Sequence, residues 1–194
     1  MSERQKIIIG VVGLFSSGKD TVAEYLESKG FKITSLSDRI REECMEKLSV
    51  DREDITIPML VKVGNELRQK SGNSILAERS LQKVQEWKDN RFVFTSLRHP
   101  DEVEFLKLNA DKFILIRVIT PIELRYEWSQ ARKKPEDRMS FEEFRALEEK
   151  QMSGSGSQQQ LSKVISMADT VFINTSKKED LYKLIDDFLK NIDK

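Results

Sequence analysis

Two glycines and a lysine near the amino end of the chain have a spacing that is typical of phosphate binding. Gly13 and Gly18 stand five residues apart, and Lys19 follows the second glycine directly. Such glycines let the backbone curl so that its N–H groups point at an anion, and the lysine reaches the same anion as a mobile charge. The pattern predicts a phosphate-binding loop, or P-loop, that holds the β- and γ-phosphates of a nucleoside triphosphate.

The residues inside this loop complete a candidate nucleotide site. We predict that the nucleotide is bound by Gly13, Ser16, Ser17, Gly18, Lys19, Asp20 and Thr21. Asp20 stands where P-loops usually have a serine or threonine whose hydroxyl binds Mg²⁺. Because a carboxylate is also a hard oxygen ligand, we predict that Asp20 acts on the metal, directly or through water. The predicted cofactors are therefore ATP and Mg²⁺.

The surrounding apolar residues predict strands that alternate with helices. Residues 7–12 form a continuous apolar run, which is typical of a strand buried on both faces. Four further strands are predicted at 31–36, 92–96, 113–119 and 170–173. Helical patterns separate these strands, so we predict a three-layer α/β fold in which a five-stranded parallel sheet carries helices on both faces.

Composition narrows the range of partners. The 194 residues include 33 Lys+Arg and 33 Asp+Glu, so the chain lacks the basic excess that is usual for nucleic-acid binding. No apolar run reaches membrane-spanning length, and no signal-peptide pattern is present. Cys44 is the only cysteine and cannot form an internal disulfide. We therefore expect a cytoplasmic monomer or homodimer that binds a small molecule, and neither nucleic acid nor membrane.

Basic residues recur where parallel sheets bind their ligands, which is at the carboxyl ends of the strands. Arg41 follows the second predicted strand and Arg98 follows the third. Since the planar guanidinium binds phosphate oxygens in pairs, we predict that both arginines bind the substrate. Arg125 and Arg132 follow the fourth strand, and with Lys19 they are predicted catalytic residues that neutralise the transferring phosphoryl group. The alternative for these two, and for Arg138, is an ordinary solvated arginine.

Asp38, just after the second strand, has two interpretations. As a general base it would take the proton of a hydroxyl acceptor, whereas at the start of a helix it would be an N-cap, as Ser37 also could be. A phosphate acceptor is already ionised and needs a cationic clamp rather than a base, and Arg41 and Arg98 supply one. We therefore favour a phosphate acceptor, and we keep Asp38 among both the catalytic and the substrate-binding candidates.

Several segments resemble the P-loop nucleoside and deoxynucleoside monophosphate kinases, which are related to adenylate kinase. The Gly-Lys-Asp-Thr form of the loop resembles the deoxynucleoside branch. The segments SLSDRIREE and FTSLRHPDEVEFLK resemble those whose arginines hold the acceptor phosphate, here Arg41 and Arg98. The run from Glu123 to Arg138 is similar to the arginine-bearing lid of these kinases.

Much of the chain, through QQQLSKVISMADTVFIN, also resembles the kinase-like domain that is fused to deoxycytidylate deaminases. A zinc-deaminase motif is missing, since His99 is the only histidine. The resemblance implies one P-loop kinase domain over residues 1–194, with an acceptor-binding helical region at about 38–90 and a lid-like insertion at about 121–157. The Gly/Ser segment 153–157 is either a hinge beside this lid or a surface loop.

The resemblance also implies a P-loop kinase fold with a helical lid, and ATP-dependent phosphoryl transfer to a nucleoside or deoxynucleoside monophosphate. Two alternatives stay open: a hydroxyl kinase of the dephospho-coenzyme A kinase type, in which Asp38 is the base, and a non-enzymatic nucleotide-binding sensor. The sensor stays open because Thr95 stands where adenylate-kinase relatives place an Asp at the end of the third strand, and because Asp20 replaces the usual hydroxyl ligand.

Overall fold

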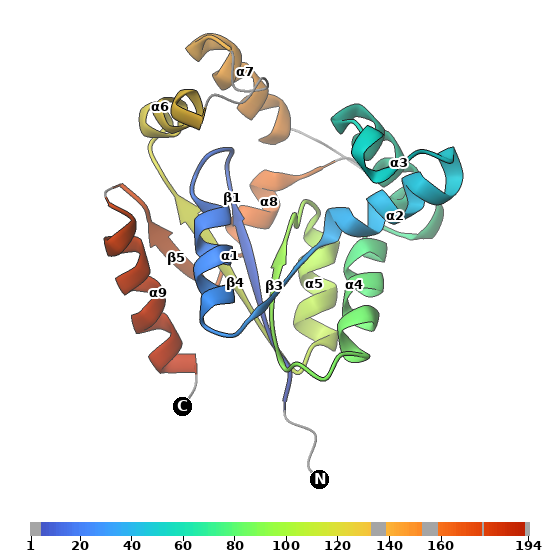
Figure 1. The fold of residues 1–194 in the computed structure, drawn as a ribbon, viewed down its shortest axis with the longest axis horizontal. Helices are drawn as coiled ribbons and strands as arrows, with labels where there is room; N and C mark the ends of the chain where they lie inside the picture. Colours follow the sequence, from blue (N-terminus) through green and yellow to red (C-terminus); the bar gives the residue numbers. More distant parts are fainter. Residues whose placement is uncertain (1–4, 133–138, 153–158, 176, 193–194) are drawn as a thin grey trace.

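The chain folds around a five-stranded sheet in which every pair of neighbouring strands is parallel (Figure 1). The computed structural model describes residues 5–132, 139–152, 159–175 and 177–192. The strand order across the sheet is β2-β3-β1-β4-β5. The strands are β1 (Ile7–Gly13), β2 (Lys32–Ser35), β3 (Arg91–Thr95), β4 (Lys112–Ile119) and β5 (Thr170–Ile173). The five predicted strands are thus confirmed to within a residue or two at their ends.

Helices connect the strands and cover both faces of the sheet. They are α1 (Lys19–Ser28), α2 (Leu36–Leu48), α3 (Ile57–Ser71), α4 (Ile75–Gln85), α5 (Pro100–Asn109), α6 (Ile122–Arg132), α7 (Phe141–Met152), α8 (Leu161–Ser166) and α9 (Lys178–Ile192), with a short 3₁₀ turn at Arg52–Asp54. Helices α1 and α9 pack on one face, and α4, α5 and α8 pack on the other with α2 and α3 beside them (Figure 1). The predicted three-layer α/β fold is confirmed.

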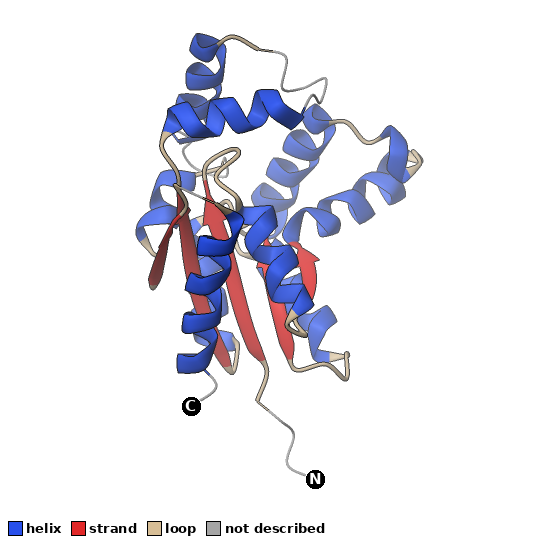
Figure 2. Cartoon of the chain, turned by 60° about the vertical axis from the view of Figure 1, so that its left-hand side comes forward, coloured by secondary structure: helices blue, strands red, loops and turns tan. Residues whose placement is uncertain are grey.

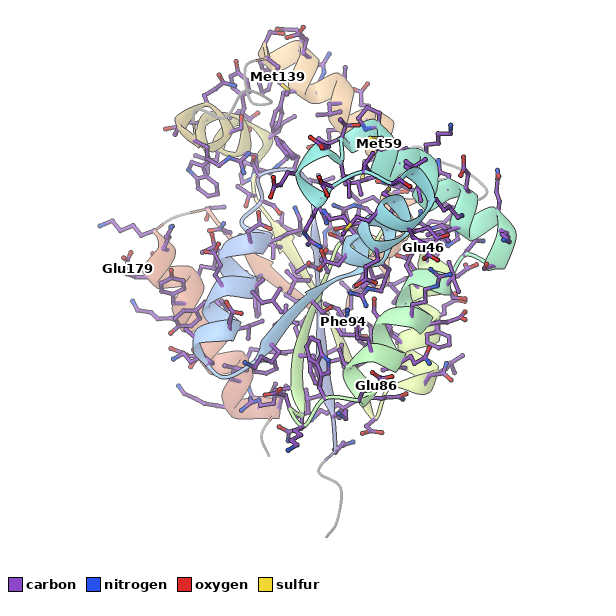
Figure 3. All side chains as sticks on the ribbon, turned by 45° about the vertical axis from the view of Figure 1, so that its right-hand side comes forward. Glu46, Met59, Glu86, Phe94, Met139 and Glu179 are labelled. Carbon is purple, nitrogen blue, oxygen red and sulfur yellow. The ribbon has the colours of Figure 1, made fainter. Side chains whose placement is uncertain are left out.

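The central strand β1 shows why its sequence is apolar throughout. Ile8 and Val12 join the core under α4, α5 and α8, whereas Ile9 and Val11 join the core under α1 and α9. Successive side chains of a strand point to opposite faces, so a strand covered on both sides needs apolar residues at every position. Figure 3 places Phe94 of the neighbouring strand β3 in the middle of the molecule, where it is fully buried.

The elements above the carboxyl ends of the strands are helical. Helices α6 and α7 lie over this end of the sheet, and α2 and α3 flank it (Figures 1 and 2). Met59 of α3 and Met139, just before α7, both lie at this end, whereas Glu86 lies at the opposite one (Figure 3). The predicted segment 153–157 and Arg138 lie outside the described residues. Each helix in the described ranges is too short or too polar to cross a membrane.

One expectation about α2 is wrong. The helix begins at Leu36, so its N-cap is Ser35 rather than Ser37 or Asp38. The hydroxyl of Ser35 makes no capping hydrogen bond and instead donates to Oγ of Ser96, at the end of the paired strand β3, over 2.9 Å. The cap moves because β2 runs directly into the helix without a loop. Asp38 lies in the first turn and has no capping role.

Substitution of a buried and of an exposed isoleucine tests which strand residues belong to the core. Ile8 of β1 is fully buried, whereas Ile173 of the edge strand β5 is 63% exposed. We predict that Ile8→Ala lowers the free energy of unfolding by about 2–5 kcal/mol, since it leaves a cavity in the core. The matched change Ile173→Ala should cost less than about 1 kcal/mol. Urea unfolding of both variants measures the difference, and equal losses would contradict the arrangement of the sheet.

Candidate functional site

The P-loop links β1 to α1, and its backbone requires both glycines. Gly18 is the N-cap of α1 with φ 94°, and a Cβ built there would lie 2.4 Å from Nδ2 of Asn174. A Cβ on Gly13 would lie 2.6 Å from the carbonyl oxygen of Val118. Because glycine carries no capping side chain, the first N–H groups of α1, from Lys19 onward, remain available to an anion.

Side chains from the ends of β4 and β5 bind the outer side of the loop. The carbonyl oxygen of Ser17 accepts hydrogen bonds from Oγ1 of Thr120 and Nδ2 of Asn174, each over 3.0 Å. Both donors are buried, and each directly follows the last residue of its strand. Our sequence reasoning missed these two residues. Their strand-end position is the only signal that could have pointed to them.

Arg125 joins α6 to the same loop. Its Nε donates to the carbonyl oxygen of Thr120 over 2.9 Å, and its Nη1 donates to that of Phe15 over 3.2 Å. The guanidinium also forms an ion pair with Glu148 of α7, and the residue is only 3% exposed. The alternative of a solvated arginine is therefore wrong for Arg125. Its catalytic role stays a prediction, since the structure engages its guanidinium in internal contacts.

Arg132, at the end of α6, contacts the tip of the loop. Its Nη2 donates to Oγ of Ser16 over 2.8 Å, and its guanidinium lies over the ring of Phe15, 5.2 Å from the ring centre. The same ring packs against Phe144 of α7 with 5.7 Å between the ring centres. The helices of the predicted lid therefore contact the P-loop through both polar and aromatic side chains.

Lys19 lies in a strongly cationic environment. Its Nζ donates to the carbonyl oxygen of Leu14 over 2.7 Å. The pKa of Lys19 is lowered to about 8, first because burial disfavours the ammonium and next because Arg98 is close. Arg125 and Arg132 lower this pKa in the same direction. A half-buried lysine close to three arginines is typical of a site that binds an anion.

The carboxylate of Asp20 acts against the positive charges around Lys19. Asp20, in the first turn of α1, raises the pKa of Lys19 and is exposed at the mouth of the loop. In the described part of the chain, no three His, Cys, Asp or Glu side chains gather as a metal cluster would require. Mg²⁺ in nucleotide sites often has only one or two carboxylates and is otherwise held by phosphates and water. A single carboxylate beside a phosphate-binding loop fits that kind of site.

The candidate acceptor residues lie at the ends of β2 and β3, which pair in register from Lys32–Phe92 to Ser35–Thr95. Arg41 donates to Oγ of Ser37 over 2.6 Å, and its Nη1 lies 3.4 Å from Asp38. Asp38 also pairs with Arg52 over 2.7 Å and is half-buried. The structure therefore places the predicted Arg41 and Asp38 in direct contact.

Arg98 occupies the end of the neighbouring strand. It is half-buried, and its Nη1 donates to the carbonyl oxygen of Leu97 over 3.2 Å. Burial lowers the pKa of Arg98, although the guanidinium stays charged. The charge of Arg98 lowers the pKa of Lys19, so its guanidinium lies near the lysine of the P-loop.

Cavity size does not locate this site. A cavity of about 1040 Å³ lies at the amino ends of the strands, where Lys6, Trp87 and Asn90 help to line it. A cavity of about 30 Å³ lies behind the P-loop, beside Ser17 and Thr120. We identify the candidate site by its chemistry, because the cationic cluster and the curled backbone are at the carboxyl end.

The lowered pKa of Lys19 predicts how stability depends on pH. The pKa of this side chain is about 8 in the folded protein and near its ordinary value of 10.5 in the unfolded chain. Between these pH values the unfolded chain binds more protons, so stability rises with pH. We expect Lys19→Met to be more stable than the natural protein at pH 7, because the variant buries no ammonium.

That advantage should shrink between pH 8 and pH 10.5 as the folded natural protein loses its proton. Urea unfolding of both proteins at pH 7, 8, 9 and 10 and at constant ionic strength measures the difference. A difference that does not change with pH would show that the lysine is not perturbed.

Comparisons with known proteins identify relatives and structural neighbours. No family model matches the chain. A UPF0200 protein of Thermococcus gammatolerans is 31% identical over 192 residues, which cover 96% of this chain and 95% of the relative. A UPF0200/UPF0201 protein of Archaeoglobus fulgidus is 32% identical over 190 residues, and the chain spans only 56% of its length.

Solved structures share the fold at low sequence identity. Shikimate kinase from Bacteroides thetaiotaomicron has a TM-score of 0.58 at 14% identity, with 95% of this chain and 98% of the neighbour covered. A putative kinase from Chloroflexus aurantiacus has a TM-score of 0.53 at 14% identity, with 98% and 99% covered. The predicted P-loop kinase fold is thus confirmed, while the narrower resemblance to nucleoside monophosphate kinases is not. By its similarity to the Thermococcus relative over nearly the full length of both proteins, the chain belongs to the UPF0200 protein family.

Proposed function

We propose that this protein is an ATP-dependent phosphotransferase whose acceptor is a nucleoside or deoxynucleoside monophosphate. The observation that carries the proposal is the cationic cluster of Lys19, Arg98, Arg125 and Arg132 around the amino end of α1. Phosphoryl transfer requires neutralisation of the charge on the transferring group more than covalent chemistry. A cluster of this kind, at a loop whose glycines cannot be replaced without collision, fits a polyphosphate donor.

On the donor side, Lys19 leaves the carbonyl oxygen of Leu14 and binds the β- and γ-phosphates. The backbone N–H groups between Gly13 and Thr21 surround the same phosphates, with the side chains of Ser16 and Ser17 in the loop. Asp20 is the residue that would hold Mg²⁺, and the ion would supply further charge neutralisation. Arg125 fixes the loop from behind, in keeping with its contacts to Phe15 and Thr120, so its contribution to catalysis is largely through position.

On the acceptor side, Arg41 and Arg98 bind the acceptor phosphate. One oxygen of that phosphate attacks the γ-phosphorus while the bond to the β–γ bridging oxygen breaks, and ADP leaves with the bonding electrons. An ionised phosphate needs no base for this step.

We assign residues 38–90 to acceptor binding and residues 121–157 to a lid that excludes water, with Arg132 reaching the transferring group from α6.

A second candidate is a kinase for a hydroxyl acceptor. One observation favours it: Asp38 has no capping role, and its half-buried carboxylate lies at the end of β2 beside Arg41. Such a carboxylate is well placed to accept the proton of a hydroxyl group. We prefer the phosphate acceptor because Arg41 and Arg98 would then bind the phosphate oxygens, whereas a hydroxyl acceptor would not require two arginines.

The test of the proposed function is a phosphotransfer assay with radiolabelled ATP against nucleoside monophosphates, deoxynucleoside monophosphates, nucleosides and dephospho-coenzyme A. We expect turnover with a monophosphate, and Lys19→Ala as the control should abolish it. Turnover with hydroxyl acceptors alone would replace our proposal by the second candidate. ATP binding that is lost in Lys19→Ala, without transfer to any acceptor, would indicate a nucleotide sensor.

Substitution of the two clamp arginines gives a sharper prediction. Arg41→Ala and Arg98→Ala each remove charge-assisted hydrogen bonds, which contribute about 1.5–3 kcal/mol each. We expect each variant to raise the KM for the monophosphate about 10- to 100-fold, with a smaller effect on the KM for ATP. Lys107→Ala is the matched control, since it removes one positive charge from α5, where Lys107 forms an ion pair with Asp169. Equal effects in all three variants would show that overall charge, rather than the clamp, matters.

Asp38→Asn separates the two kinds of acceptor. The asparagine keeps the shape of the side chain but cannot take a proton. If the acceptor is a phosphate, we expect kcat to fall less than about tenfold, because no general base is used. A general base accelerates a reaction by about 10²–10⁴-fold. A loss of that size in kcat would therefore show that the acceptor is a hydroxyl group. Steady-state kinetics at saturating ATP measure the difference.

A further inference from the structure

Glu102 is a buried carboxylate that the proposed reaction does not use. It lies in the first turn of α5 and is fully buried. A buried carboxylate is costly unless it is paired and hydrogen-bonded through both oxygens. The hydrogen-bond partners of its two oxygens therefore show which segments this carboxylate holds together.

One oxygen of Glu102 binds a helix from another part of the chain. Oε1 accepts hydrogen bonds from Nη2 and Nε of Arg68 over 2.8 and 3.3 Å. Arg68 belongs to α3 and is only 4% exposed. The ion pair therefore links α5 to α3, which we assign to the acceptor side of the site.

The other oxygen binds the segment that carries the acceptor arginine. Oε2 accepts hydrogen bonds from the backbone N–H groups of Arg98 and His99 over 2.7 and 3.0 Å. The carbonyl oxygen of Arg98 accepts from the backbone N–H of Gln160 over 2.8 Å. The side chain of Gln160 also lies 3.0 Å from Nε2 of His99. Both backbone polar groups of Arg98 are thus held, one by α5 and one by the start of α8.

A capping role alone does not account for these contacts. The capping box of α5 needs one oxygen of Glu102, which binds the N-cap residue His99. It needs neither a bond to Arg98 nor a buried arginine from α3. Of the two additional contacts, one holds the backbone N–H of Arg98 and the other joins the same carboxylate to α3.

We propose that Glu102 is a positioning residue, which fixes the backbone of Arg98 and, through Arg68, ties the placement of this arginine to α3. The inference rests on the proposed function in one respect, because it takes Arg98 as part of the acceptor site. The placement itself is a property of the protein without substrate. Glu102 touches no substrate and acts only through Arg98.

The test uses two variants of the full chain. Glu102→Gln removes the charge, and the double variant Arg68→Met with Glu102→Gln removes the ion pair without leaving an unpaired buried arginine. We expect the amide protons of Arg98 and His99 to exchange at least about tenfold faster in both variants, because these N–H groups lose the carboxylate that binds them. Thermal melts confirm that each variant is folded.

Kinetics with the monophosphate that the natural protein phosphorylates provide the second readout. We expect kcat/KM for this acceptor to fall about 10- to 100-fold in both variants, as is typical of a misplaced substrate-binding group. The KM for ATP should stay within about twofold. Asp169→Asn is the matched control, because Asp169 likewise accepts from a backbone N–H, that of Leu115, and pairs with Lys107. The control should change neither KM nor the exchange at Arg98.

Amide exchange at Arg98 that matches the natural protein in both variants would overturn the inference. So would a double variant with natural kinetics, because Glu102 would then serve stability alone. If the natural protein phosphorylates no acceptor, the proposed function fails. The exchange of the Arg98 and His99 amides still decides the positioning role in that case.

Discussion

The P-loop must turn its N–H groups toward one side, so its carbonyl groups need partners on the other. The structure supplies them from several elements: Lys19 binds the carbonyl of Leu14, Arg125 that of Phe15, and Thr120 and Asn174 that of Ser17. These donors come from α1, from α6 and from the ends of β4 and β5. The parallel sheet therefore does more than present the loop, since its strand ends hold the loop in a conformation suited to phosphates.

The same arrangement concentrates positive charge around the side chain of Lys19. Arg98, Arg125 and Arg132 all lower the pKa of Lys19, whereas the carboxylate of Asp20 is the acid that opposes them. The repulsion between these cations lowers the stability of the folded protein, and a bound polyphosphate would offset this repulsion. Preorganised charge of this kind favours a transition state whose oxygens carry negative charge, because no reorganisation is needed when the phosphoryl group moves.

The sequence was sufficient for the strands and the loop, because both are local patterns. The apolar run of β1 and the spacing of Gly13, Gly18 and Lys19 each lie within a few residues of one another. The supporting residues could not be predicted, because their partners are remote: Thr120 and Ser17 are 103 residues apart, and Arg68 and Glu102 are 34 apart. The hydrophobic periodicity of a sequence does not indicate which buried arginine forms an ion pair with which carboxylate.

A crystal structure with Mg²⁺ and a non-hydrolysable ATP analogue tests the central claim most directly. The account predicts that the triphosphate lies against the backbone N–H groups of the loop and that Nζ of Lys19 has left the carbonyl oxygen of Leu14 for the β- and γ-phosphates. A nucleotide bound elsewhere on the molecule, with Lys19 still on the Leu14 carbonyl, would contradict it.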